Sequence, residues 1–317
     1  MRSNATPRLL LTLAALAACL PPPAAAQDVP PVVRHITVTD RDGRFVKGLA
    51  RESFAVYEGG AEREVISVSQ EDAPVSLGVV FDMSASMTAA SGQELDAARR
   101  ALADFHGRSH PANEYFVLGF AEAPRLLADW SRAAGPFVAG LNALPSMQKK
   151  GTHATALYDA LYEGLEKVRR GAHAKRVVLV VSDGADNGSR RKLADVRRLA
   201  AETGALIYAL AVYAHAGQGA GGAPLRRLEE LCRATGGRVF YVESYHPMWR
   251  AQAVAEQAKV GLWLQTLALE LRTQYAVAFR AAAGGDLRRV EVKVGQPAKR
   301  KNTVARLEVY VPATPQP

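Results

Sequence analysis

The chain is poor in cysteine, and after its N-terminal region it has no long uncharged apolar stretch. Cys19 and Cys232 are its only cysteines, which excludes a small scaffold held together by disulfides. The absence of a later stretch of about 20 apolar residues predicts no transmembrane helix. Hydrophobic residues nevertheless make up 48% of the 317 residues. That is enough for a sizeable core, and it argues against a disordered or fibrous protein.

The first 26 residues are typical of an export signal. Arg2 and Arg8 supply positive charge before an almost entirely apolar run, Leu9 to Leu20. Prolines break that run, and Ala24 to Ala26 form an Ala-x-Ala cleavage site. The run is too short to span a bilayer. We therefore expect an exported protein, periplasmic or extracellular, whose mature chain begins at Gln27.

A second interpretation of this segment concerns Cys19. Leu16-Ala17-Ala18-Cys19 is similar to a bacterial lipobox, in which the cysteine carries a lipid anchor. The general signal-peptide pattern favours the soluble product, and the lipoprotein stays open as the alternative. Cleavage after Ala26 would leave Cys232 without an intramolecular disulfide partner.

Basic residues exceed acidic ones, 40 to 31, giving a formal charge of +9. Removal of residues 1–26 lowers that charge to about +7, since the segment holds two arginines and no acid. The basic residues are scattered, and their densest cluster, Lys299 to Lys301, falls in an expected turn. We see no nucleic-acid-binding motif and expect no nucleic-acid partner.

The middle of the chain, residues 74–273, alternates apolar runs with helical patterns. Runs of this kind suit parallel strands that are buried on both faces. We therefore predict an α/β domain with a doubly wound, mainly parallel sheet. The expected central strands are Val75 to Phe81, Tyr115 to Phe120, Arg176 to Val181 and Ala205 to Val212, with a short edge strand at Leu126 and Leu127.

Residues 27–73 and 274–317 have the shorter alternating pattern of antiparallel strands. Neither segment has enough strands to be stable alone, so we expect both to pack together as one small β-module. The expected strands are Val32 to Val38, Phe54 to Tyr57, Val65 to Val68, Tyr275 to Phe279, Val290 to Val294 and Val304 to Val311.

Oxygen-bearing side chains gather where the predicted strands end. Ligands of open α/β sheets bind beyond the carboxyl ends of the strands, and Mg²⁺ and Mn²⁺ prefer octahedral oxygen coordination. Two carboxylates and three hydroxyls at these ends predict a divalent metal site. The candidate ligands are Asp82, Ser84 and Ser86 after the first strand, Thr155 at the start of a helix, and Asp183, which follows Ser182.

At these positions the chain resembles the von Willebrand factor type A (VWA) domain and its metal-ion-dependent adhesion site. Asp82-x-Ser84-x-Ser86, the later Thr155 and Asp183 match that site's three elements in order. The resemblance implies that the hydroxyls touch the metal and that the carboxylates hold it partly through water. It also implies that an Asp or Glu carboxylate of an unknown partner protein completes the coordination.

The chain departs from the family pattern in two places. Ala85 stands where glycine is common, and the usual Gly-Gly-Thr reads Gly151-Thr152-His153-Ala154-Thr155. Thr152 is therefore an alternative ligand, although the helical pattern favours Thr155. We expect His153 to be an exposed loop residue because hard cations prefer oxygen. The choice among Mg²⁺, Mn²⁺ and Ca²⁺ stays open.

The resemblance extends to the flanking segments. Val38 to Gly43, Gly48-Leu49, Phe54 to Gly60 and Gln274-Tyr275 are similar to the leader and tail of exported bacterial "VWFA-related domain" proteins. It implies an architecture for nearly the whole mature chain and names no partner.

Enzymatic alternatives lack their motifs. A haloacid-dehalogenase-type phosphatase needs a second Asp where Ser84 stands, and the Gly-x-Ser-x-Gly of a serine hydrolase is absent. A calcium loop beginning at Asp183 would place Ala194 at its twelfth position, which argues against an EF-hand. We therefore expect a binding protein and no enzyme. The alternatives are a metal-independent structural module of an envelope assembly and a Mg²⁺-dependent hydrolase.

Overall fold

The computed structural model describes residues 31–40, 42–90, 92–144, 154–214, 222–245, 250–282 and 290–295. Several predicted features lie outside these residues. They are the export signal with Cys19 and the Gln27 terminus, the loop with Thr152 and His153, the cluster Lys299 to Lys301 and the expected strand Val304 to Val311.

A six-stranded sheet forms the centre of the α/β part. Its order is β10-β9-β8-β5-β6-β7, and all neighbours are parallel except β7, which runs antiparallel to β6 at the edge. This confirms the predicted fold class, and the four predicted central strands occupy the four inner positions. The strands are β5 (Val75–Asp82), β6 (Glu114–Phe120), β7 (Pro124–Ser131), β8 (Lys175–Ser182), β9 (Leu206–Ala214) and β10 (Val239–Ser244).

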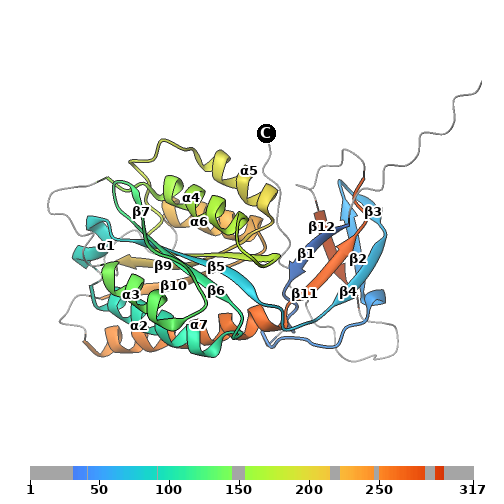
Figure 1. Cartoon of the computed structure of the whole chain (residues 1–317), viewed down its shortest axis with the longest axis horizontal. Coiled ribbons are helices and arrows are strands. Elements are labelled where there is room, and N and C mark those ends of the chain that lie inside the picture. The colour runs from blue at the N-terminus through green and yellow to red at the C-terminus, as the bar shows by residue number, and fades with distance from the viewer. Residues whose placement is uncertain are drawn as a thin grey trace, which may run out of the picture.

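Helices cover both faces of this sheet (Figure 1). Successive strand residues point to opposite faces, so in β5 Val79 belongs to one core cluster and Val80 to the other. One face is covered by α2 (Gly92–Arg108), α3 (Ala134–Ala143) and α7 (Arg250–Thr273). The other is covered by α4 (Leu157–Arg169), α5 (Leu193–Thr203) and α6 (Ala223–Ala234). None of the described helices is both long and apolar enough to cross a membrane.

Two helices were not expected from the sequence. One is α1 (Ala85–Ala90), whose small and polar residues give little periodic signal, and the other is α3. In α3, Gly140 weakens the helical propensity. Its packing explains the glycine, because a Cβ there would lie 2.6 Å from the Cβ of Ala128 on β7. The edge strand β7 is longer than the expected pair Leu126 and Leu127, because it pairs with β6 along most of its length.

The remaining strands form two small antiparallel sheets. One has the order β1-β11-β4 and the other β12-β2-β3, so strands before the α/β part pair with strands after it, as expected. Their shared core includes Ile36, Val56 and Phe279. We call these strands the β-module: β1 (Val32–Ile36), β2 (Phe54–Glu58), β3 (Ala61–Arg63), β4 (Val65–Ser69), β11 (Tyr275–Phe279) and β12 (Val290–Val294), with a 3-10 turn at Arg51–Ser53.

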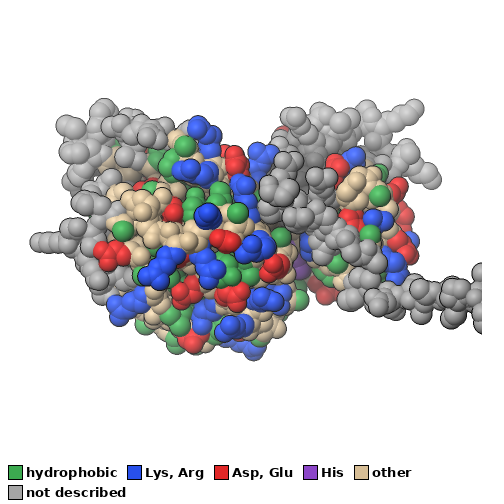
Figure 2. Space-filling view, turned by 90° about the horizontal axis from the view of Figure 1, so that it is seen from above, with side chains coloured by type: hydrophobic (Ala, Val, Ile, Leu, Met, Phe, Trp, Pro, Cys, Tyr) green, Lys and Arg blue, Asp and Glu red, His purple; other side chains and the backbone are tan. Residues whose placement is uncertain are grey.

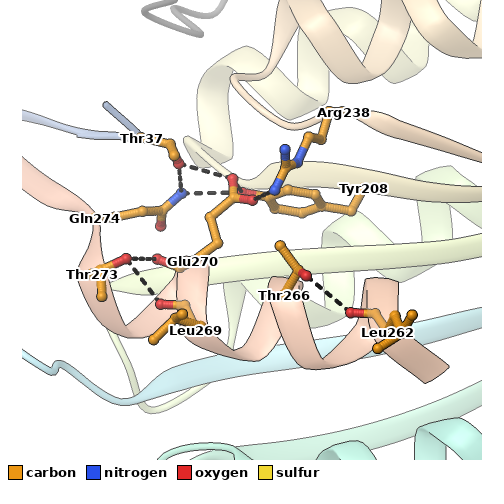
Figure 3. Close-up of polar contacts among 9 residues, drawn as sticks. All are labelled: Thr37, Tyr208, Arg238, Leu262, Thr266, Leu269, Glu270, Thr273 and Gln274. Carbon is orange, nitrogen blue, oxygen red and sulfur yellow. Dashed lines mark hydrogen bonds and ion pairs between the residues drawn. The ribbon is translucent and has the colours of Figure 1, made fainter. Parts of the chain in front are cut away.

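A buried polar network joins the β-module to the α/β part (Figure 3). Glu270, near the end of α7, is 1% exposed. Its carboxylate accepts hydrogen bonds of 2.8 Å from Thr37 and from Tyr208 and pairs with Arg238. Gln274 donates to the same two hydroxyls at 3.1 and 3.0 Å. The network therefore links the segment after β1, the strand β9 and the end of α7.

Candidate metal centre

The centre is built where β5 and β8 end. These strands are parallel neighbours, with Phe81 opposite Val181, so the next residues, Asp82 and Ser182, stand side by side at the carboxyl edge of the sheet. The Ser182 hydroxyl donates a 2.7 Å hydrogen bond to Asp82 Oδ2. This bond orients the carboxylate at the strand ends.

Asp82 is fully buried, at 0% exposure. Its Oδ1 accepts a 2.9 Å hydrogen bond from the backbone N–H of Ser84. Burial, together with the nearby Asp183 carboxylate, raises the pKa of the Asp82 carboxyl to about 7, although its hydrogen bonds from Ser84 and Ser182 act in the opposite direction. Desolvation and a neighbouring like charge both disfavour the ionised form. A cation held between the two carboxylates would reverse both effects.

The two serines of the motif lie next to each other. Ser84 is buried, whereas Ser86 is exposed, and their hydroxyl oxygens are 3.2 Å apart. Ser86 lies inside the short helix α1. The N–H of Met83 donates to the Phe120 carbonyl at 2.7 Å, which fixes the start of this segment against the end of β6.

Thr155 is buried and precedes α4; the helix begins at Leu157 and not at Thr155 as expected. Its N–H donates to Asn187 Oδ1 at 2.6 Å, and its carbonyl accepts from the N–H groups of Asn187 and Gly188, both at 3.0 Å. These bonds tie the threonine to the loop that follows β8 and carries Asp183. Thr155 therefore belongs to the same edge of the sheet as the other four candidates.

The loop after β8 is a tight turn. Asp183 Oδ1 accepts the N–H of Ala185 at 2.9 Å, and Gly184 donates its N–H to the Ser182 hydroxyl at 3.0 Å. Gly184 has a φ of +79°, and a Cβ there would lie 2.9 Å from the Pro224 carbonyl oxygen. Only glycine fits such a position without strain.

Two residues that position the site are not evident from the sequence alone. Ser182 stands at a predicted strand end, and only the register between β5 and β8 places its hydroxyl against Asp82. The Asn187 side chain accepts a hydrogen bond from the backbone N–H of Thr155, which lies 32 positions earlier in the chain. No local sequence pattern predicts this contact.

The donor set fits a hard divalent cation. It consists of two carboxylates and three hydroxyls, which are oxygen ligands of the kind that Mg²⁺ and Mn²⁺ take. In the part of the chain that the structure describes, no group of three or more His, Cys, Asp or Glu side chains could hold a metal ion. The hydroxyls are thus an essential part of the proposed site.

The family comparison covers this edge. Residues 77–185 match the sequence model of the von Willebrand factor type A domain. The chain contains a VWA domain. The matched range runs from β5 to the turn after β8 and includes all five candidate ligands of this VWA domain.

Several solved structures are similar to this chain at low identity. BatB from Bacteroides thetaiotaomicron is 16% identical, with 58% of this chain and 99% of that chain covered and a TM-score of 0.44. The PilB minor pilin of Streptococcus sanguinis is 12% identical, covering 64% and 63%, with a TM-score of 0.46. Proximal thread matrix protein 1 from the mussel byssus, with a zinc-occupied MIDAS motif, is 17% identical, covering 71% and 50%, with a TM-score of 0.48. No curated protein sequence matches the chain.

Proposed function

We propose that this protein is an exported VWA-domain protein that binds a protein partner through Mg²⁺ or Mn²⁺. The cation is held by Asp82, Ser84, Ser86, Thr155 and Asp183. The observation that carries the proposal is the buried Asp82 carboxylate, which Ser182 and Ser84 orient beside a second carboxylate.

The five residues have two kinds of role in this proposal. The hydroxyls of Ser84, Ser86 and Thr155 offer neutral oxygen ligands, and Asp82 and Asp183 offset the charge of the ion. When bound, the cation supplies a positive centre with coordination positions open to an incoming ligand. A partner that presents an Asp or Glu carboxylate fits such a centre, because hard cations prefer anionic oxygen.

Binding is favoured over catalysis because the sequence motifs of the enzymatic alternatives are absent. The Ser182 hydroxyl donates a hydrogen bond to Asp82 and accepts one from the N–H of Gly184, so it holds the strand end and the following turn together. A phosphatase would need a second carboxylate at the position of Ser84. We therefore assign no catalytic residue.

Isothermal titration of the full chain with Mg²⁺ and with Mn²⁺ tests the site. We expect saturable heats for the wild type and none for Asp82→Ala. The matched control is Asp104→Ala, which removes an exposed carboxylate from α2. Equal heats for wild type and Asp82→Ala would show that the metal is bound elsewhere.

Capture of partners from an envelope extract tests the use of the site. We expect bound protein in Mg²⁺ that is released by EDTA and absent with Asp82→Ala. Capture that persists in EDTA would favour the metal-independent structural module. Phosphatase and esterase assays of the same protein address the hydrolase alternative, for which we expect no turnover.

Export is a separate part of the proposal and has its own test. Mass spectrometry of the protein recovered from its native host should find a chain beginning at Gln27 or a lipidated Cys19. Recovery of the intact Met1 form alone would contradict both the soluble and the anchored versions.

A further inference from the structure

Helix α7 exposes large apolar side chains to solvent. Val254, Leu262 and Leu269 are 63%, 62% and 48% exposed, and they are three of the five large hydrophobic residues exposed in the described chain. The other two, Val33 and Leu126, lie on separate strands. Single exposed apolar residues are ordinary, whereas a contiguous group marks an interaction surface.

These three side chains lie on one line along the helix. Their spacing of eight and seven positions keeps them on the same face of an α-helix, and exposed Ala258 and Gln265 fall between them. We call this line the α7 stripe: Val254, Ala258, Leu262, Gln265 and Leu269. The opposite side of the same helix, including Trp263 and Leu264, is buried in the core of the α/β part.

The α7 stripe is nearly free of net charge. The exposed positions from 251 to 273 include only two charged residues, Lys259 and Arg272, and each is paired with an acid, Glu256 and Asp72 respectively. The α7 stripe therefore offers no unpaired charge that would attract a strongly charged partner. A membrane-surface helix carries a strongly cationic polar face, which this helix lacks. The chemistry fits another apolar, uncharged helix.

We propose that the α7 stripe is the contact between two copies of this chain, with their α7 helices packed antiparallel. A two-fold contact requires a surface that is complementary to itself. With the axis at Gly261 and Leu262, Val254 of one copy faces Leu269 of the other at both ends of the contact. A Cβ at Gly261 would meet nothing within 4 Å, so there is room for the second copy's Leu262. Antiparallel helices also place their opposite dipole ends together.

The direction of α7 gives the dimer a functional consequence. The helix follows β10, whose carboxyl end lies at the edge of the candidate metal centre, and it runs toward the β-module (Figure 1). Over its 24 residues it is about 36 Å long. Antiparallel pairing therefore puts the two metal edges at opposite ends of the dimer. If the proposed function holds, such a dimer bridges two partners; the dimer itself does not depend on the metal.

Sedimentation velocity of the full chain over a concentration series tests the contact. One helix seam is smaller than a standard interface of about 1,600 Å², so we expect a reversible dimer with a micromolar dissociation constant. Leu262→Lys should remain monomeric. Leu126→Lys, an exposed leucine changed in the same way on β7, should dimerise like the wild type. A wild type that stays monomeric, or a Leu262→Lys variant that still dimerises, overturns the proposal.

Cysteine cross-linking tests the register, in a Cys19→Ser background. Cys232 is buried, and burial raises the pKa of its thiol, so it should stay unreactive. Leu262→Cys, at the axis, should form a disulfide with itself. Val254→Cys and Leu269→Cys should each remain single and should cross-link when mixed. Self-pairing of Val254→Cys would indicate parallel helices and overturn the arrangement.

Discussion

The Ser182 hydroxyl donates a 2.7 Å hydrogen bond to Asp82 Oδ2, and this bond joins the ends of two neighbouring strands. The same hydroxyl accepts the N–H of Gly184 at 3.0 Å. Ser182 thus connects a buried carboxylate to the turn that carries Asp183. The relative position of the two carboxylates of the proposed metal site therefore depends on a residue that is not itself a proposed ligand.

Replacing Ser182 by alanine should weaken both the fold and the site. The variant leaves a buried carboxylate oxygen without its donor, for which a loss of about 1–3 kcal/mol in the free energy of unfolding is usual. We also expect a several-fold weaker affinity for Mg²⁺, because Asp82 is no longer oriented. Urea unfolding with and without Mg²⁺ measures both effects. The control, exposed Ser67→Ala on β4, should change neither.

Asp82→Asn should separate the structural role of this residue from its electrostatic role. The amide oxygen can still accept the N–H of Ser84, and the Ser182 hydroxyl can turn to accept from the new NH₂ group. The substitution removes a charge that burial and Asp183 disfavour. Without metal, we expect the variant to be at least as stable as the wild type. Mg²⁺ at about 100 times its dissociation constant should add roughly 2.7 kcal/mol to the wild type and nothing to the variant. A similar gain in both proteins would place the ion away from Asp82.

The two threonines before α4 can be distinguished in the same assay. We expect Thr155→Val to lose Mg²⁺ binding, because it removes a hydroxyl ligand. The backbone hydrogen bonds with Asn187 and Gly188, which hold residue 155 at the proposed site, are kept. Thr152→Val should bind Mg²⁺ as the wild type does. The reverse result would transfer the ligand role to Thr152, the alternative left open by the sequence.

The strands of the sheet were predictable because burial on both faces leaves a strong sequence signal. β5 and the part of β8 after Arg176 are mostly apolar, and each strand ends at a polar residue within one position of the expected boundary. The helices α1 and α3 were not predictable, since they are short and depend on packing, as the contact of Gly140 with Ala128 shows. The candidate ligands followed from strand ends, whereas the roles of Ser182 and Asn187 needed the register between distant segments.

Glu270 should be a main determinant of how the β-module and the α/β part hold together. It is 1% exposed and receives hydrogen bonds from Thr37 and Tyr208 in addition to its pairing with Arg238. Breaking a buried ion pair by removing one partner typically costs about 3–5 kcal/mol. We expect Glu270→Ala to lower the free energy of unfolding by this order, as measured in urea.

A matched control comes from the β-module. Glu64 forms a 3.3 Å ion pair with Arg280, and their side chains are 67% and 52% exposed. Exposed pairs contribute about 0–1 kcal/mol, so Glu64→Ala should have a small effect. Equal losses for the two variants would mean that the Glu270 network adds nothing beyond a surface ion pair.

His35 should make the protein sensitive to acid. It lies on β1, opposite Ala276 of β11. Burial, together with the positive charges of Lys175 and Arg34, lowers the pKa of this imidazole to about 3. The unfolded chain binds a proton below about pH 6.5, whereas the folded chain resists protonation down to about pH 3. The unfolded state therefore binds more protons in this window, and stability should fall as the pH drops from 6.5 toward 3.

The contribution of this single group to the slope is at most about 1.4 kcal/mol per pH unit. We expect His35→Gln to flatten the profile of unfolding free energy between about pH 6.5 and 4. Lys175→Met should act in the same direction more weakly, because it removes one of the charges that keep the imidazole neutral. Urea unfolding of the three proteins at several pH values measures this. Parallel profiles for wild type and His35→Gln would show that the acid sensitivity comes from other groups.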